Sequence, residues 1–474
     1  MKKIRSIHFV GIKGVGMTPL AIIAKEARFI VSGCDIADEF ITDESLKKAG
    51  IMPLIGFSKH HLEDIDMVIT TGAHGGFDNP EVIHAKQIKI PVWTQGEAVA
   101  EFMKGDLFNR KQIGISVTGS HGKTTTTAMI ATVLKEAGKD PSYVVGTGFV
   151  PSLGSCGHYG EGKYFVAEAD EYANEPTYDK TSKFLLQHPE ILIFTNIEHD
   201  HPDLYPTVDD VRESFLEFAN NLSNSGMLIA YGADIQTEKL LKRYTGKVIT
   251  FGFTKNCDFV ISRISGSGEQ TFFWLSRQGS LLGEFCLSIP GDHNVLNATA
   301  AIIAGLECGI AIDVLKQAIK KFVGSKRRFE YVGTLPSGAV LYDDYAHHPT
   351  EIKKTLAAFK KRFPKSKLVC IFQPHTYSRT KSLFEDFISS FQSADTIIIS
   401  NIYSSLREKA DLTISSKLLV DRIKLFHKDV WFLPELVDVI KYVQGQQYGK
   451  DTVVVTMGAG DIYKIASSLL ASSV

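Results

Sequence analysis

The segment 118–127 reads Thr-Gly-Ser-His-Gly-Lys-Thr-Thr-Thr-Thr, and these residue types at this spacing can bind phosphate. An apolar run at 113–117 precedes the segment, and a helix-like run at 128–137 follows it. In such a strand–loop–helix unit, backbone N–H groups at the helix start face an anion, a lysine adds charge and a threonine hydroxyl can hold Mg²⁺. The segment therefore predicts a site for a nucleoside triphosphate. The residues expected to line it are Gly119, Ser120, His121, Gly122, Lys123, Thr124 and Thr125.

The loop departs from the common phosphate-binding pattern at one position. The pattern G-x-x-x-x-G-K-[ST] has its first glycine where this chain has Val117. A glycine-rich helix start with an accidental lysine is the alternative interpretation. The run of four threonines between a strand and a helix disfavours it.

Two further apolar runs, at 165–167 and 191–195, end in polar side chains. The first leads into Glu168 and Asp170, and the second leads into a cluster of acids and histidines at 196–203. In α/β proteins, the carboxyl ends of parallel strands share the edge where ligands bind. Carboxylates suit Mg²⁺, and the second cluster can bind a metal or polarise a phosphoryl group. A solvated acidic loop remains an alternative for the first cluster.

The N-terminal segment 11–16 is also rich in glycine and reads G-x-x-G-x-G. Counted from Gly14, the dinucleotide fingerprint G-x-G-x-x-G requires a small residue at position 19, where the chain has Pro19. Asp35 follows the next apolar run. A dehydrogenase half-domain, a nucleotide-sugar site and a purely structural turn all fit this pattern.

Three later segments, 291–298, 343–350 and 372–380, carry polar groups beside apolar runs. The asparagines of the first can both donate to and accept from an adenine edge, although an ordinary helix cap fits as well. The third contains Arg379, whose guanidinium can bind a carboxylate with two hydrogen bonds. Polar surface loops are the alternative for the second and third segments.

The composition of the chain argues against several classes of protein. With 44% hydrophobic residues and a net charge of −1, the chain lacks the basic excess of a general nucleic-acid binder. Its six cysteines form no C-x-x-C pair, which fits a reducing cytosol better than a disulfide framework or a zinc ribbon. We see no signal peptide and no apolar run long enough to span a membrane, and we therefore expect a cytoplasmic protein.

The chain is too long, at 474 residues, for one ordinary hydrophobic core. Strand–glycine–helix starts at 7–17, 113–123 and 452–461 predict α/β domains with mostly parallel sheets. A polar segment at 105–110 and a basic cluster at 324–328 are the expected boundaries. The expected domains cover residues 1–107, 108–325 and 326–474.

Taken together, these segments resemble the ATP-dependent Mur ligases of bacterial cell-wall synthesis over essentially the whole chain. The T-G-x-x-G-K-T-T loop is that family's own variant, which accounts for Val117. Two of the matching motifs, at 343–351 and 372–380, are typical of the member that adds L-alanine. Besides the loop, the matching motifs are E-A-D-E at 168–171, N-I-E-x-D-H at 196–201, G-x-H-N-x-x-N-A at 291–298, R-R-F-E at 327–330, D-D-Y-x-H-H-P-T-E at 343–351 and F-Q-P-H-x-Y-S-R-T at 372–380.

The resemblance implies an α/β fold with three domains: a Rossmann-like UDP-binding domain, a central P-loop ATPase-type domain and a Rossmann-like C-terminal domain. It also implies the reaction. ATP phosphorylates the lactyl carboxylate of UDP-N-acetylmuramate, and the amine of L-alanine then attacks the acyl phosphate. A related ligase that attaches a tripeptide or a different first amino acid is the alternative. We expect a monomer or weak homodimer without nucleic-acid partners.

The resemblance also assigns roles to individual residues. Lys123 would stabilise the charge of the γ-phosphoryl group. Thr124 and Glu168 would hold one Mg²⁺, and His201 would help to hold a second, with Mn²⁺ as a substitute. The further expected contacts are adenine for Asn294 and Asn297, ATP for Arg328 and Asp344, substrate carboxylates for His348 and Arg379, and UDP for Gly14, Val15, Gly16, Asp35 and Thr71.

The chain departs from the family pattern at a few positions. Lys13 stands where relatives commonly have glycine, Pro19 follows the loop, and the segment 94–97 replaces an arginine-containing stretch. Ligases that add later amino acids carry a carbamylated lysine near the position of Leu216, which favours the alanine-adding member. Two hypotheses outside the ligases stay open at this point: a dinucleotide-dependent oxidoreductase and a nucleotide-gated switch.

Overall fold

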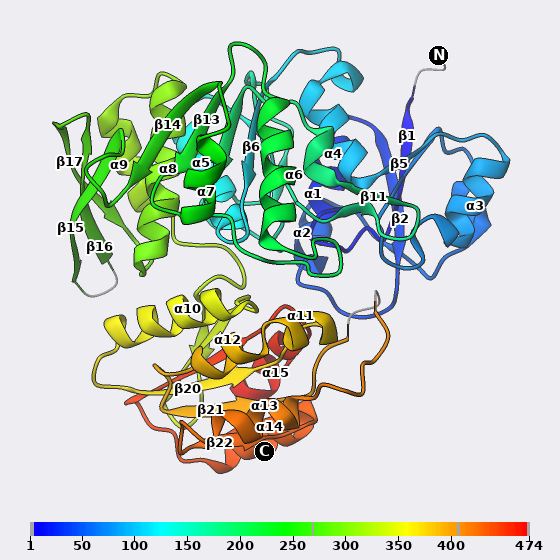
Figure 1. The fold of residues 1–474 in the computed structure, drawn as a ribbon. Coiled ribbons are helices and arrows are strands. Elements are labelled where there is room, and N and C mark those ends of the chain that lie inside the picture. The colour runs from blue at the N-terminus through cyan, green and yellow to red at the C-terminus, as the bar shows by residue number, and fades with distance from the viewer. Residues whose placement is uncertain (1–3, 268–269, 405–407, 472–474) are drawn as a thin grey trace. The chain divides into compact units, whose positions relative to one another are not determined.

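The computed structural model describes residues 4–267, 270–404 and 408–471 (Figure 1). The chain divides into two compact units. The first unit holds the residues up to Ser265 together with Phe272–Ser288 and Asn294–Ser325, and the second holds the residues from Lys326 onward together with short segments that include Ile289–His293. The expected α/β class with mostly parallel sheets is confirmed. The domain boundaries drawn from the sequence stay a prediction.

The N-terminal part of the first unit is built on a parallel sheet with the order β3-β2-β1-β4-β5. Its strands are β1 (Ser6–Val10), β2 (Ile30–Asp35), β3 (Leu54–Ile55), β4 (Met67–Thr70) and β5 (Val92–Thr94). Its helices are α1 (Thr18–Glu26), α2 (Asp43–Lys48), η1 (Lys59–Leu62), η2 (Gly76–Asp78), α3 (Pro80–Gln87), α4 (Gln95–Lys104) and η3 (Asp106–Phe108). Pro19 lies in the first turn of α1, where its missing N–H has no intrahelical partner to lose.

The central part of the first unit contains a large sheet with the order β17-β16-β15-β14-β13-β12-β6-β9-β7-β8. Strands β6, β9 and β12 read as nearly continuous apolar runs because both faces of the sheet are covered there. The strands are β6 (Ile113–Thr118), β7 (Ser142–Val144), β8 (Gly157–His158), β9 (Tyr164–Glu168), β12 (Ile191–Phe194), β13 (Met227–Tyr231), β14 (Lys247–Gly252), β15 (Phe259–Ser267), β16 (Gln270–Arg277) and β17 (Ser280–Leu287). A separate hairpin pairs β10 (Ala173–Glu175) with β11 (Asp179–Ser182) in antiparallel orientation.

Helices pack on this sheet through apolar stripes. In α6, Val211, Phe215 and Phe218 recur at helical spacing and form one core cluster with Leu192 and Phe194 of β12. The helices of this part are α5 (Lys123–Glu136), η4 (Lys183–Leu186), α6 (Val208–Asn220), α7 (Ile235–Leu241), α8 (Asp292–Glu307) and α9 (Ile312–Lys321).

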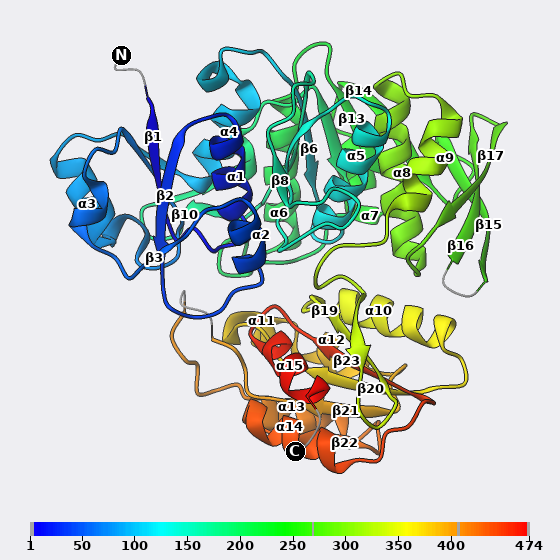
Figure 2. The ribbon, with the colours of Figure 1, turned by 180° about the vertical axis from the view of Figure 1, so that it is seen from behind.

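The second unit has a sheet with the order β18-β19-β23-β20-β21-β22, in which only the β18–β19 pair is antiparallel (Figure 2). Two apolar clusters make it a three-layer α/β domain: one contains Phe359 of α10, and the other contains Val439 of α14. Its strands are β18 (Glu330–Thr334), β19 (Val340–Asp344), β20 (Lys367–Phe372), β21 (Thr396–Ile399), β22 (Val430–Phe432) and β23 (Thr452–Met457). Its helices are α10 (Pro349–Arg362), α11 (Tyr377–Ser382), α12 (Phe384–Ser389), α13 (Ser416–Ile423), α14 (Leu436–Gly445), η5 (Ile462–Lys464) and α15 (Ile465–Leu470).

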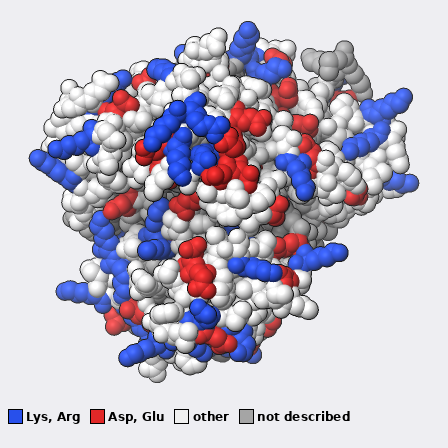
Figure 3. Space-filling model, viewed as in Figure 1, with Lys and Arg blue, Asp and Glu red and all other residues white. Residues whose placement is uncertain are grey.

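The described residues show a surface of mixed charge and a core without disulfide bonds, as the composition predicts. On the face drawn in Figure 3, Lys and Arg side chains are interspersed with Asp and Glu side chains. The six cysteines are free thiols, and all but Cys286 are buried. Within the described residues, none of the helices combines the length and the apolar character needed to cross a membrane.

Candidate active site

The phosphate loop connects β6 to α5, and two of its glycines have left-handed backbone conformations. Gly119 has a φ of +137° and Gly122 a φ of +84°. A Cβ on Gly119 would lie 1.9 Å from Oγ1 of Thr195, and a Cβ on Gly122 would lie 2.5 Å from Oδ1 of Asn297. Both the conformation and the available space therefore require glycine at these two positions. The second contact also places the predicted adenine residue Asn297 beside the loop.

The segment after β12 holds the loop in shape. His121 donates its backbone N–H to Oδ1 of Asn196 at 3.0 Å, and the Thr195 hydroxyl donates to the carbonyl oxygen of His121 at 2.5 Å. Ser120 donates its N–H to the carbonyl oxygen of Asn196 at 3.1 Å. Because β12 and β6 are neighbours in the sheet, the residues that follow β12 lie beside the phosphate loop and hold its backbone by hydrogen bonds.

Lys123, the first residue of α5, turns back over the loop. Its Nζ donates to the carbonyl oxygen of Gly119 at 2.6 Å and pairs with the Glu171 carboxylate at 2.9 Å. Burial disfavours the ammonium, but the charges of Glu171 and Asp170 outweigh this effect and raise the pKa of Lys123. The lysine is therefore held as a cation. The sequence reasoning assigned no role to Glu171, although the last letter of E-A-D-E was its signal.

Thr124 and Glu168, the residues expected to hold one Mg²⁺, lie side by side. The Thr124 hydroxyl donates to Oε2 of Glu168 at 3.1 Å, and Gly146 donates its N–H to Oε1 at 2.5 Å. Val117 of β6 pairs in register with Glu168 of β9, so the carboxylate lies next to the start of the loop. A hydroxyl and a carboxylate oxygen beside a phosphate loop are ligands that Mg²⁺ accepts.

A second group of possible metal ligands lies close by. The group consists of Asp170, Glu171 and His201. Each offers one ligand atom, and these three atoms lie within 4.8 Å of one another. His201 has a φ of +54°, and its Nε2 lies 3.8 Å from Oε1 of Glu171. The His201 ring packs at 4.8 Å from the ring of Tyr172. Two carboxylates and an imidazole can hold a divalent ion.

At the N-terminal loop, Asp35 binds backbone N–H groups, and its Oδ1 also lies 3.3 Å from Nε2 of His74. Its Oδ2 accepts the backbone N–H of Lys13 at 2.8 Å, its Oδ1 accepts the N–H of Ile36 at 2.8 Å, and the side chain is 0% exposed. The ammonium of Lys13 bends away to the carbonyl oxygen of Asp38 at 2.8 Å. Asp35 thus fastens the loop backbone. Its predicted direct contact with UDP stays a prediction.

The remaining residues of the predicted UDP site surround the same loop. Gly14, Val15 and Gly16 are partly exposed, whereas Gly11 is buried beside Thr71. The side-chain amide of Gln95 lies beside the loop, since a Cβ on Gly16 would be 3.2 Å from its Nε2. From the sequence, the segment 94–97 was notable only as a departure from the family pattern, and Gln95 was not expected beside the loop. Nothing in the local pattern carried that signal.

In the second unit, Asp344 is the last residue of β19, and His348 and Arg379 follow β19 and β20, which both pair with β23. Asp344 accepts the backbone N–H groups of Phe329 and Ala346 at 2.7 and 2.9 Å. Burial raises the pKa of its carboxyl to about 6, against the opposing charge of Arg328. The guanidinium of Arg328 lies 4.9 Å from the centre of the Tyr345 ring.

His348 and Arg379 are both at least nine-tenths buried at this edge. The Nδ1 of His348 accepts the N–H of Thr350 at 3.3 Å and so caps α10. The guanidinium of Arg379 lies 3.2 Å from Nδ1 of His375. The rings of His347 and His375 stand 6.0 Å apart, which brings the two segments to one place. The sequence reasoning did not single out His375.

Comparison with known proteins covers nearly the full chain. Residues 6–106 match the Mur ligase family catalytic domain, residues 117–305 match the Mur ligase middle domain, and residues 327–460 match the Mur ligase glutamate ligase domain. A UDP-N-acetylmuramate–L-alanine ligase of Desulfitobacterium hafniense is 38% identical over 465 residues, which are 98% of this chain and 99% of that protein. One of Syntrophotalea carbinolica is 37% identical over 470 residues, 98% of each chain.

Solved structures of Mur ligases also resemble this chain over nearly its full length. The UDP-N-acetylmuramate–alanine ligase MurC of Thermotoga maritima superimposes with a TM-score of 0.80 at 29% identity, over 98% of each chain. The murein peptide ligase of Psychrobacter arcticus superimposes with a TM-score of 0.72 at 25% identity, also over 98% of each chain. The three matching domain models and the full-length identities show that this chain belongs to the Mur ligase family, with the three-domain architecture of that family.

Proposed function

We propose that this chain is an ATP-dependent ligase that joins L-alanine to the lactyl carboxylate of UDP-N-acetylmuramate in peptidoglycan precursor synthesis. The observation that carries the proposal is the 38% identity to a UDP-N-acetylmuramate–L-alanine ligase over 98% of the chain. The phosphate loop supplies the matching chemistry, because Lys123 is kept as a cation beside the loop carbonyl oxygens.

The reaction needs ATP because a free carboxylate has no good leaving group. Phosphorylation of the carboxylate gives an acyl phosphate. The neutral amine of L-alanine then adds to the acyl carbon, and phosphate departs as the amide forms. Little covalent work falls to the protein, so positioning and charge stabilisation dominate catalysis. We assign charge stabilisation at the transferring phosphoryl group to Lys123.

Two donor sets fit divalent ions. Thr124 and Glu168 offer oxygen atoms beside the phosphate loop, and His201 with Asp170 and Glu171 offers a second set. Bound Mg²⁺ or Mn²⁺ would neutralise phosphate charge there. Glu171 already pairs with Lys123, so it links the lysine to the second set.

The substrate contacts are further parts of the proposal. The half-exposed loop at Gly14, Val15 and Gly16 suits the UDP group, with Gln95 beside it. Asp35 would act through the loop backbone that it holds. In the second unit, Arg379 and His348 suit the carboxylates, and Arg328 suits ATP phosphate.

The main competing function is the attachment of a peptide. Among solved structures, the murein peptide ligase of Psychrobacter arcticus has a TM-score of 0.72 at 25% identity, against 0.80 at 29% for the alanine ligase of Thermotoga maritima. A dinucleotide-dependent oxidoreductase is disfavoured, because the acid expected to bind ribose is held by the N–H groups of Lys13 and Ile36. We further propose a cytoplasmic reaction and a monomer or weak homodimer.

The test is phosphate release from ATP with UDP-N-acetylmuramate and a panel of amine substrates. We expect release only when both the sugar nucleotide and an amino acid are present, with L-alanine preferred over glycine and L-serine. Mass spectrometry should show one amide-linked alanine on the sugar nucleotide. Turnover that needs a tripeptide would move the chain to the peptide-attaching class. Turnover without the sugar nucleotide would overturn the proposal.

A further inference from the structure

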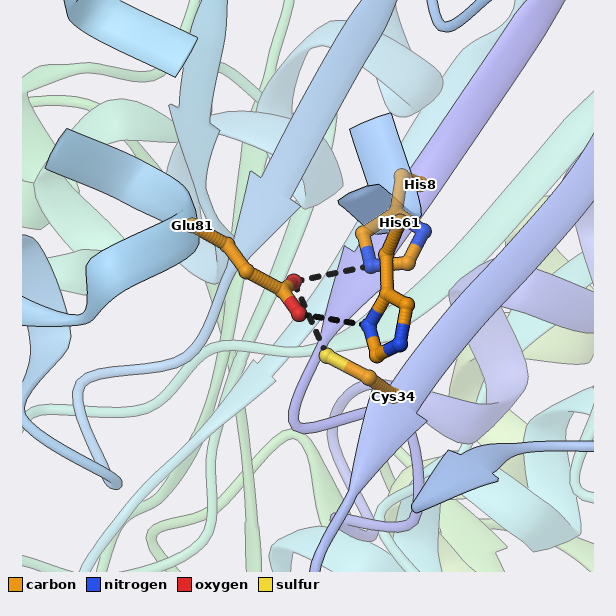
Figure 4. Close-up of side chains that lie close together, drawn as sticks. All are labelled: His8, Cys34, His61 and Glu81. Atoms are coloured by element: carbon orange, nitrogen blue, oxygen red, sulfur yellow. Dashed lines mark hydrogen bonds and ion pairs between the residues drawn. The ribbon is translucent and has the colours of Figure 1, made fainter. Parts of the chain in front are cut away.

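The N-terminal part of the first unit contains a buried cluster that the proposed reaction does not use. It consists of His8 on β1, Cys34 at the end of β2, His61 on η1 and Glu81 on α3. Figure 4 shows these four side chains converging from four separate elements. His8, Cys34 and Glu81 are 0% exposed, and the His61 side chain is 19% exposed. No residue of the cluster belongs to the proposed nucleotide, metal or substrate sites.

The Glu81 carboxylate lies at the centre of the cluster. Its Oε2 lies 3.0 Å from Nε2 of His8 and 3.0 Å from Sγ of Cys34, and its Oε1 lies 2.7 Å from Nδ1 of His61. One ligand atom from each of the four residues lies within 4.8 Å of all the others. Ligand atoms around a tetrahedral zinc ion are about 3.3–3.6 Å apart, given zinc–ligand bonds of about 2.0–2.3 Å. The separations in the cluster, from 2.7 Å to at most 4.8 Å, bracket these distances.

The donor set selects a particular class of ion. A thiolate and two imidazoles are soft or borderline ligands, which favour zinc and its neighbours over Mg²⁺ or Ca²⁺. The charges of the ligands favour a divalent ion. One thiolate, one carboxylate and two neutral imidazoles around a divalent ion sum to zero, so the site would carry no net buried charge.

The surroundings of His8 support ligation through Nε2. Its other nitrogen, Nδ1, lies 2.8 Å from the hydroxyl of Ser32. A proton on Nδ1 that is donated to Ser32 leaves the lone pair of Nε2 facing the cluster. Metal-bound histidines are commonly fixed in this way by a partner at the other ring nitrogen.

We propose that His8, Cys34, His61 and Glu81 form a structural site for one divalent transition-metal ion, with Zn²⁺ as the occupant. Binding forms a sulfur–metal bond and releases the proton of the Cys34 thiol to solvent. The carbonyl oxygen of Cys34 accepts the N–H groups of Gly11 and Ile12 at 2.9 and 3.1 Å. The ion would thus brace β1 and β2 where they hold the glycine-rich loop.

The decisive experiment uses Co²⁺ as a spectroscopic probe of the full chain after removal of metals by a chelator. Excess Mg²⁺ is present throughout to occupy sites built from oxygen ligands. We expect one equivalent of Co²⁺ to bind and to give a sulfur-to-cobalt charge-transfer band with the visible bands of a tetrahedral ion. Absence of the charge-transfer band in the wild-type chain would overturn the proposal without the need for any variant.

Two variants and a control locate the ion. Cys34→Ser should abolish the charge-transfer band, and Cys257→Ser, at a buried thiol outside the cluster, should retain it. His61→Gln removes the most exposed ligand, so it should fold and bind Co²⁺ at least about tenfold more weakly. A band that survives Cys34→Ser, or an affinity unchanged by His61→Gln, contradicts the assignment.

A thermal measurement adds a readout that is independent of colour. Zn²⁺ in about hundredfold excess over its dissociation constant should raise the melting temperature of the metal-free chain by about 5 °C. The same addition should not move the melting temperature of Cys34→Ser. An equal rise in both proteins would assign the stabilisation to another site and overturn the proposal.

Discussion

The phosphate loop and the N-terminal glycine-rich loop begin from the same local pattern, but they give their acidic side chains different partners. At the phosphate loop, Glu171 pairs with the ammonium of Lys123 at 2.9 Å. At the N-terminal loop, the fully buried Asp35 accepts the backbone N–H of Lys13 at 2.8 Å. The first arrangement gathers charged side chains beside the proposed triphosphate site. The second uses a carboxylate to hold backbone N–H groups, and the partly exposed residues 14–16 are left for the proposed contact with UDP.

The largest expected effect comes from removing the cation of the first arrangement. Lys123→Ala should lower kcat by about 10³-fold or more, since charge stabilisation at a transferring phosphoryl group is lost. Phosphate release under saturating substrates measures this. Lys135→Ala, at an exposed lysine on the same helix, should leave the rate unchanged. Near wild-type turnover in Lys123→Ala would remove its assigned role.

Glycine substitutions test the two loops with the same chemical change. Gly119→Ala should abolish ATP turnover, because its φ is +137° and the new Cβ would lie 1.9 Å from Oγ1 of Thr195. Gly14→Ala should change stability by less than about 1 kcal/mol, since its nearest neighbour would lie at 3.4 Å. Thermal unfolding and turnover of both variants make the comparison. Equal damage from both would show that the loops are equally constrained.

Asp35→Asn tests the second arrangement. The amide places an N–H donor against backbone donors, which should destabilise the loop by about 1–3 kcal/mol. We expect KM for the sugar nucleotide to rise about tenfold or more while kcat changes little, because the loop and not the phosphoryl site is disturbed. Asp38→Asn, at an exposed side chain nearby, is the matched control. A fall in kcat alone would place Asp35 in the chemical step instead.

Asp344 extends the comparison to the second unit and should give an effect that appears only as the pH falls. Burial raises the pKa of its carboxyl from 3.8 to about 6 in the folded chain. The folded state therefore binds more protons than the unfolded state between these two pH values, so this group favours folding as the pH falls from about 6 to 4. The stability of the wild type relative to Asp344→Asn should rise over that range, by about 3 kcal/mol at most. Chemical denaturation at a series of pH values measures the difference, and a constant difference would contradict it.

Much of the architecture could be predicted from short segments of the sequence. Apolar runs followed by glycine predicted β1, β6 and β23 to within a residue or two, because a buried parallel strand and a tight turn leave short-range signatures. The end of the chain was predicted less well. The helix expected after the start at 452–461 is divided into η5 and the short α15.

The sequence by itself determined the phosphate loop and its threonine. It also determined that carboxylates lie at the ends of strands. It did so because each motif depends on the backbone of a few consecutive residues. Only the tertiary structure decided which partners meet. The strand order β12-β6-β9 brings Glu171 to Lys123 and Asn196 to the loop, and the order β2-β1-β4 gathers His8 and Cys34 around Glu81. Such contacts join residues 47 to 75 positions apart, and strand order, which short-range spacing does not encode, sets them.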